Sequence, residues 1–221
     1  MAPLRLAVLA SGRGSNLQAI LDAIAQGTLA ANVVGVFSDR AKSGAIERAF
    51  AAGVHREVIR PADFESRDAF DESLFSRIAL VHPDLIVCAG YMRLLGAAQV
   101  EAWSGRMINI HPSLLPLFKG LRTHEQALAA GVGEHGASVH FVTCELDGGP
   151  VIAQARVPVH AGDDAASLAD RVLEREHPLL LETLRLFAAH RIALADDGVH
   201  VDGRPLTMPL QLRGDALEHA A

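Results

Sequence analysis

Asn109 and His111 are the two residues whose types and spacing most clearly suggest chemistry. They lie in an apolar run that begins at Met107, and the alternation of a strand would place both side chains on one face. Pro112 follows at once and ends the strand. Polar side chains at a strand end, beside a loop, are how α/β enzymes present catalytic groups. The alternative is that the pair only satisfies backbone groups of the loop up to Gly120.

A glycine turn at residues 11–16, which reads SGRGSN, is a second candidate site. It follows an apolar run and precedes a helical pattern, so backbone N–H groups and a helix N-terminus converge on it. The turn has no Gly-Lys-Ser/Thr, and Leu17 stands where the dinucleotide fingerprint needs glycine. Gly14, with the side-chain donors of Ser15 and Asn16, favours a phosphate monoester as the ligand. The alternative is a tight turn in which Ser15 caps the helix.

Two charged residues lie where helices do not favour them. Arg67 is in the first turn of a predicted helix, at the positive end of its dipole, so it is either solvated or serves a ligand. Glu176 falls on the apolar stripe of a long C-terminal helix, where a carboxylate is costly unless it is paired or binds something. The alternative is that Glu176 reaches solvent or pairs with Arg171 or Arg175 of its own helix.

The elements that position these residues alternate between strand and helix as far as His111. Apolar runs predict strands at 4–10, 32–38 and 84–90, before the one that ends at His111, and residues 54–60 are expected to form a further strand. Periodic apolar residues predict helices from Leu17, at 41–52, at 67–81 and up to Trp103. This order predicts a doubly wound parallel sheet with right-handed crossovers.

After residue 120 the pattern becomes that of antiparallel strands. Residues 137–143 and 151–159 alternate, and ELDGGP at 145–150 connects them. The predicted class is therefore α/β, with a mostly parallel, doubly wound sheet and antiparallel strands towards the C-terminus. No linker or internal repeat divides the chain, so we expect one domain over 1–221.

The C-terminal region is predicted to contain a long helix, a hairpin and a loose tail. Asp163 or Asp164 would cap the helix, and Pro178 should kink or divide it. The dipeptide Asp-Gly at 202–203 is a type I′ turn signal for a small hairpin. The tail from about residue 209 is expected to be loosely ordered.

Composition excludes several classes of function. Half of the 221 residues are hydrophobic and 21% are charged, which predicts a substantial core. No apolar run reaches the roughly 18–20 residues of a membrane span, and the first residues read as a strand and not a signal peptide, so we expect a cytoplasmic protein. A net charge of −6 without a basic block argues against a nucleic-acid partner.

The cysteines and three of the histidines are predicted to be structural. Cys88 and Cys144 are too far apart for a CxxC site and are expected to be reduced core residues. His124, His135 and His140 have no metal-binding spacing and are interpreted as structural or polar-loop residues, so no metal is expected.

Five motifs between Leu4 and about Phe187 resemble the folate-dependent formyltransferases. They are SGRGSNLQAI at 11–20, AGYMRLL at 89–95, INIHPSLLP at 108–116, HGASVHFVTCELDGGP at 135–150 and REHPL at 175–179. The chain most resembles the branch that formylates glycinamide ribonucleotide in de novo purine biosynthesis. That resemblance implies that the ribonucleotide amine attacks the formyl carbon of 10-formyltetrahydrofolate, the cosubstrate.

The resemblance also implies roles for individual residues. The catalytic residues would be Asn109, His111 and Asp147. The phosphate of the ribonucleotide would be bound by Gly14, Ser15 and Asn16, and its glycinamide end by Glu176. The folate would be bound by Arg67, Met92, Arg93, Leu94, Leu95, Asn109, Thr143, Cys144, Glu145, Leu146 and Asp147. Leu173, where many relatives carry a polar or basic residue, and Pro178 depart from the family pattern.

These roles agree with the chemistry of formyl transfer. The reaction passes through a tetrahedral carbon that bears an oxyanion, and the Asn109 amide can donate a hydrogen bond to it. An imidazolium at His111 can donate another and then protonate the departing folate nitrogen. We expect Asp147 within about 4–6 Å of His111, where its charge would raise the pKa of the imidazole towards the working pH.

Three alternatives to this function differ in what they require. A methionyl-tRNA formyltransferase would need a further C-terminal domain and a basic surface. A formyltetrahydrofolate deformylase usually carries an extra N-terminal domain and has no phosphorylated acceptor. A non-catalytic folate- or nucleotide-binding module would have no use for the three catalytic residues. We expect small-molecule substrates only and a monomer or weak homodimer.

Overall fold

The computed structural model describes residues 2–220, which divide into two compact units, 2–109 and 110–220. No helix within the described range is both long and apolar enough to cross a membrane.

The first unit is a parallel sheet built from buried apolar runs. In spatial order its strands are β5, β4, β1, β2 and β3, and every neighbouring pair is parallel. The strands are β1 (Leu4–Leu9), β2 (Ala31–Ser38), β3 (Arg56–Val58), β4 (Leu85–Cys88) and β5 (Met107–His111). Chain order and spatial order differ in the way a doubly wound sheet requires, since the chain adds strands on one side of β1 and then on the other.

The helices of the first unit begin and end near the predicted positions. They are α1 (Ser15–Ala25), α2 (Gly44–Ala51), α3 (Arg67–Leu80) and α4 (Ala97–Ala102), with a 3₁₀ turn η1 (Pro61–Asp63). The predicted helix at 41–52 starts later because Ser43 is its N-cap, and the Ser43 hydroxyl accepts the Ala45 N–H. Ser66 caps α3 in the same way through the Ala69 N–H.

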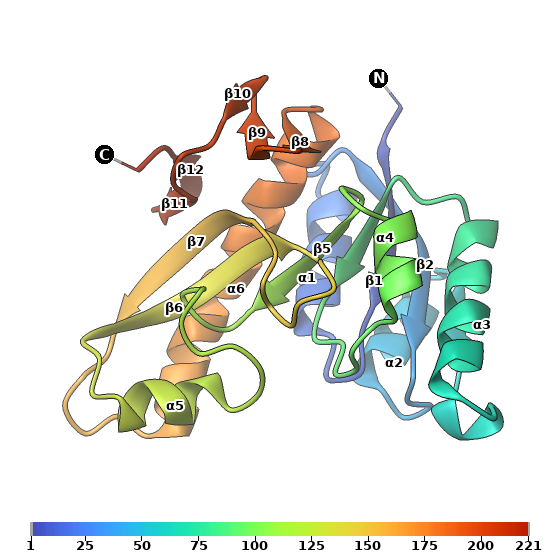
Figure 1. Cartoon of the computed structure of the whole chain (residues 1–221), viewed down its shortest axis with the longest axis horizontal. Helices are drawn as coiled ribbons and strands as arrows, with labels where there is room; N and C mark the ends of the chain where they lie inside the picture. The colour runs from blue at the N-terminus through green and yellow to red at the C-terminus, as the bar shows by residue number, and fades with distance from the viewer. Residues whose placement is uncertain (1, 221) are drawn as a thin grey trace. The chain divides into compact units, whose positions relative to one another are not determined.

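The second unit contains antiparallel strands packed on one long helix. Strands β6 (Glu134–Phe141) and β7 (Val151–Pro158) pair antiparallel, with Ser138 opposite Gln154. Helix α6 (Ala165–Ala188) packs on both strands (Figure 1), and α5 (Thr123–Ala129) precedes β6. The predicted α/β class, with antiparallel strands towards the C-terminus, is confirmed.

The C-terminal predictions are confirmed in part. Asp164 caps α6 in a reciprocal capping box with Ser167. Pro178, predicted to kink or divide the helix, lies inside α6, which continues undivided through it. The hairpin is confirmed, with β9 (Gly198–Val201) antiparallel to β10 (Arg204–Pro205) and positive φ angles of 53° and 74° at Asp202 and Gly203. Strand β8 (Ile192–Ala195) completes this small sheet.

The tail from residue 209 was expected to be loosely ordered, and this expectation is wrong. It forms β11 (Leu210–Arg213) and β12 (Ala216–Glu218), and β11 pairs parallel with β7. The physical reason is the alternation of Leu210 and Leu212, both of which are buried. The expectation of a loose tail gave more weight to the position near the chain end than to this short apolar alternation.

Candidate active site

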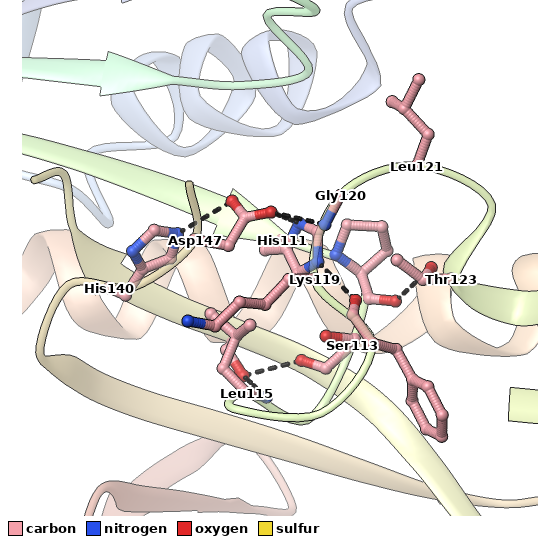
Figure 2. Close-up of polar contacts among 12 residues, drawn as sticks. His111, Ser113, Leu115, Lys119, Gly120, Leu121, Thr123, His140 and Asp147 are labelled. Carbon is pink, nitrogen blue, oxygen red and sulfur yellow. Dashed lines mark hydrogen bonds and ion pairs between the residues drawn. The ribbon is translucent and has the colours of Figure 1, made fainter. Parts of the chain in front are cut away.

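His111 is the last residue of β5, and its ring is buried, with 5% of the residue exposed. Its Nε2 atom lies 3.0 Å from the carbonyl oxygen of Phe118. Because a carbonyl only accepts hydrogen bonds, Nε2 carries the hydrogen. The other nitrogen, Nδ1, faces Asp147 at 3.5 Å from Oδ2, so the predicted proximity of these two side chains is confirmed (Figure 2).

The carboxylate of Asp147 is held from three directions (Figure 2). Its Oδ2 accepts the Gly120 N–H at 2.8 Å and also faces His111, while its Oδ1 lies 3.7 Å from Nε2 of His140. Burial alone would raise the pKa of Asp147, but the hydrogen bonds from His140 and Gly120 and the two histidine charges hold it below its usual value. Asp147 is therefore a carboxylate at neutral pH.

His140 was interpreted as structural, but it lies beside Asp147. Its Nδ1 donates to the carbonyl of Phe141 at 2.8 Å, which orients the ring so that Nε2 faces the carboxylate. The site thus has a second imidazole that sequence reasoning missed. The available signal was weak: His140 stands near the end of a strand that leads into the ELDGGP turn.

The expectation for the pKa of His111 was wrong in direction. Burial lowers this pKa below the ordinary value of 6.5, although the Phe118 carbonyl and the Asp147 charge act in the opposite direction. Desolvation outweighs the carboxylate because the ring is almost completely enclosed. In the free protein at pH 7, His111 is consequently a neutral imidazole with its proton on Nε2.

The loop between β5 and α5 places the Phe118 carbonyl and the Gly120 N–H. Phe118 and Gly120 both have left-handed backbones, with φ angles of 54° and 79°. Such a conformation is strained for phenylalanine, and strained residues gather at functional sites. Lys119, between them, forms an ion pair with Glu145 at 2.6 Å.

A buried polar network fixes this loop to the β6–β7 hairpin. The hydroxyl of Ser138 donates to the Ser113 carbonyl at 2.7 Å and accepts the Leu115 N–H at 3.0 Å. The side-chain amide of Gln154 donates to the Leu115 carbonyl at 2.8 Å. Because these groups are buried and mutually satisfied, the loop has one preferred position.

Glu176 is half-buried on α6, between the buried residues Val172 and Leu180. The two arginines considered as its partners have other contacts. Arg171 pairs with Asp163 at 2.6 Å, and Arg175 donates to the Gly214 carbonyl at 2.8 Å.

The glycine turn in the first unit leads directly into α1. Gly14 is the N-cap, with a φ of 74° and no side-chain cap, so the alternative of Ser15 as the cap is wrong. A Cβ at Gly14 would lie 2.7 Å from the Cα of Ala45, so only glycine allows the turn to pack on α2. Ser15 and Asn16 are the first residues of α1, where backbone N–H groups lack intrahelical partners.

The segment 92–95 lies against the start of α3. Arg67 is neither simply solvated nor free, because its Nε lies 3.6 Å from the buried carboxylate of Asp71. The guanidinium of Arg93 lies over the ring of Phe70, 5.3 Å from its centroid. Met92 and Leu94 are more than half exposed, which leaves apolar side chains available to a ligand.

The segment 143–147 in the second unit precedes the Gly-Gly-Pro turn. A Cβ at Gly149 would lie 1.9 Å from the carbonyl oxygen of Phe141, so glycine is required there. Cys144 is exposed, and its interpretation as a core residue is wrong, whereas Cys88 is buried as predicted. Leu146 is 49% exposed.

The structure therefore groups the predicted residues within each unit. In the second, His111 and Asp147 are in contact. In the first, Gly14, Ser15 and Asn16 form one turn, and Arg67 lies on the helix that contacts segment 92–95. Asn109 is half-buried on β5, two residues before His111.

Residues 4–184 match the family model described as formyl transferase. The chain belongs to the formyl transferase family. It is 46% identical over 203 residues to the phosphoribosylglycinamide formyltransferase of Escherichia coli (strain K12), covering 92% of this chain and 96% of that protein. It is also 40% identical over 194 residues to the human trifunctional purine biosynthetic protein adenosine-3, covering 88% of this chain but 19% of that protein.

Solved structures of formyl transferases share the fold. A phosphoribosylglycinamide formyltransferase from Coxiella burnetii has a TM-score of 0.89 and 48% identity, covering 93% of this chain and 96% of that one. A formyltetrahydrofolate deformylase from Pseudomonas syringae has a TM-score of 0.83 and 25% identity, covering 90% of this chain and 66% of that one. Similarity is thus greater to the first of these two enzymes in both sequence and structure.

Proposed function

We propose that this chain transfers the formyl group of 10-formyltetrahydrofolate to the amine of glycinamide ribonucleotide, a step of de novo purine biosynthesis. The observation that carries the proposal is the buried pair of His111 and Asp147, 3.5 Å apart, at the end of β5. It supplies an enclosed proton acceptor next to a fixed negative charge. The similarity to enzymes named phosphoribosylglycinamide formyltransferase supplies the substrates.

The proposed reaction is a direct attack by the amine. The nitrogen lone pair forms a bond to the formyl carbon, and the carbonyl electrons move to its oxygen. The side-chain amide of Asn109 donates a hydrogen bond to that oxyanion. The neutral imidazole of His111 takes up the proton that the attacking nitrogen loses, and Asp147 stabilises the imidazolium. The same proton then passes to the departing folate nitrogen as the carbon–nitrogen bond breaks.

The binding residues are proposed on the same basis. Gly14, Ser15 and Asn16 would bind the phosphate, which suits the convergent donors at the start of α1. Glu176 would bind the amino end of the acceptor. The folate would be bound by the residues of 92–95 and 143–147 together with Arg67 and Asn109.

A formyl-transfer assay tests the function directly. Purified protein with 10-formyltetrahydrofolate should release tetrahydrofolate only when glycinamide ribonucleotide is present. Release without the ribonucleotide would indicate a deformylase, and formylation of methionyl-tRNA would indicate the other family branch. Binding of both ligands without turnover would indicate a non-catalytic module.

We also propose one formyltransferase domain over 1–221, because the family match over 4–184 spans both compact units. A cytoplasmic location and a monomer or weak homodimer complete the proposal. Small-molecule substrates are its only proposed partners.

Replacing Ser15 with alanine should raise KM for the ribonucleotide by about 10- to 100-fold, because a hydrogen bond to a charged group is lost. KM for the folate should change by less than about twofold. Steady-state kinetics with each substrate varied measures both values. Ser76→Ala, an exposed serine of α3, is the control and should leave both unchanged. A selective rise in KM for the folate would show that the turn binds the other ligand.

Replacing Glu176 with glutamine should reduce kcat/KM for the ribonucleotide by about 10- to 100-fold, because the charge that would recognise the acceptor amine is removed. The shape of the side chain is kept, so Tm should change little. Kinetics and thermal unfolding measure the two effects. Glu174→Gln, on the exposed side of α6, is the matched control. Full activity of Glu176→Gln would mean that Glu176 has no role in recognition.

A further inference from the structure

Ser11 is a buried residue that connects the glycine turn to the segment that follows β4. Its backbone N–H donates to the carbonyl of Gly90 at 3.0 Å. Its hydroxyl oxygen accepts the N–H of Met92 at 3.1 Å, and the residue is 2% exposed. The turn proposed to bind phosphate and the segment proposed to bind folate are therefore joined through one residue.

The connection extends the pairing of β1 with β4 beyond the ends of both strands. Ala89 N–H donates to the Leu9 carbonyl at 2.9 Å, and the bond from Ser11 to Gly90 comes next. Gly90 then has a left-handed backbone, with a φ of 77°. The next hydrogen bond has a side-chain acceptor in place of a backbone carbonyl, because the Met92 N–H donates to the Ser11 hydroxyl oxygen. The identity of residue 11 therefore decides whether the last bond can form.

On its other side, the glycine turn is fixed to α2. The Ser43 hydroxyl donates to the Gly12 carbonyl at 3.1 Å, and Nε of Arg48 donates to the Arg13 carbonyl at 3.0 Å. The turn is thus held by α2 on this side, and Ser11 links it to the segment that follows β4.

The chain has a separate anchor just after the segment 92–95. The buried carboxylate of Asp71, on α3, accepts the Gly96 N–H at 2.9 Å. Asp71 holds the segment from α3, whereas Ser11 belongs to the glycine turn. A variant at Asp71 therefore tests how the segment is anchored, and a variant at Ser11 tests how it is connected to the glycine turn.

We propose that Ser11 is a positioning residue that couples the two substrate sites. Phosphate bound at Gly14, Ser15 and Asn16 restricts the turn, and Ser11 transmits that restriction to the segment at Met92. The segment then loses less conformational entropy when folate binds, and by linkage folate strengthens ribonucleotide binding by the same factor. This role rests on the proposed function, since it requires the phosphate to bind at Gly14, Ser15 and Asn16 and the folate to contact residues 92–95.

Binding of tetrahydrofolate, which carries no formyl group to transfer, tests the coupling. Its Kd should be measured by calorimetry with and without saturating glycinamide ribonucleotide. For the unmodified protein we expect binding about 5- to 20-fold tighter with the ribonucleotide, within the usual range of coupling between sites. Ser11→Ala should reduce this factor to less than about twofold. Asp71→Asn should weaken tetrahydrofolate binding several-fold but retain the coupling factor.

Hydrogen exchange at the Met92 amide gives a second measurement. In the unmodified protein the ribonucleotide should slow this exchange, and in Ser11→Ala it should not. The proposal is overturned if Ser11→Ala keeps the coupling factor, if Asp71→Asn removes it equally, or if the unmodified protein binds both ligands without coupling. Absence of ribonucleotide binding to the unmodified protein would instead contradict the proposed function.

Discussion

Replacing Asp147 with asparagine should lower kcat by about 10²- to 10⁴-fold, the range expected when proton transfer is impaired. The carboxylate lies 3.5 Å from Nδ1 of His111, the nitrogen on which the imidazole would take up a proton. Burial already lowers the pKa of His111, and loss of the negative charge should lower it further. Steady-state kinetics measures kcat, and an NMR titration of the imidazole measures the pKa.

The pH dependence of this variant follows from the same shifts. The pKa of Asp147 is below its usual 3.8 and that of His111 is below 6.5, so the free protein at pH 7 has a carboxylate beside a neutral imidazole. The acid limb of kcat/KM should lie below pH 6.5 and move lower in Asp147→Asn. Asp170→Asn, an exposed carboxylate of α6, should change neither quantity. Full turnover of the Asp147→Asn, His111→Asn double variant would exclude the proposed mechanism.

Replacing Asn109 with alanine should lower kcat by about 10²- to 10³-fold, as expected when a donor to an oxyanion is removed. Both KM values should change little, because this hydrogen bond strengthens mainly in the transition state. Rapid-quench or steady-state measurement of formyl transfer gives the rate.

Two comparisons make the Asn109 result interpretable. Asn32→Ala, an exposed asparagine at the start of β2, should have unchanged kinetics. Thermal unfolding of Asn109→Ala should show a folded protein, since the side chain is only half-buried. A rise in KM for the folate with kcat unchanged would show that Asn109 binds the cosubstrate and does not stabilise the transition state.

Much of the fold could be predicted because its parallel strands are buried on both faces. Continuous apolar runs identified β1, β4 and β5, and β5 ends at His111 where Pro112 follows. Turn chemistry was equally informative at Asp202, where a left-handed backbone was expected and is found. In these places local sequence and tertiary structure favour the same conformation.

The site was predicted only as far as local patterns extend. The contact of His111 with Asp147 was inferred from a resemblance, and nothing in the 35 intervening residues requires it. The pKa of His111 could not be obtained from the sequence, because its direction depends on how completely the ring is enclosed. The place of His140 beside Asp147 likewise depends on the path of the turn at 143–150.

Strands β11 and β12 have a consequence for self-association. In the second unit β7 has β6 on one side and β11 on the other. Without residues 210–218 the side of β7 now paired with β11 would become an open edge, and such edges recruit strands from other molecules. The two β7 residues that pair with β11, Ala153 and Gln154, are uncharged, so at this point the edge would offer little charge repulsion to an incoming strand. Strands β11 and β12 thus protect β7 from intermolecular sheet formation.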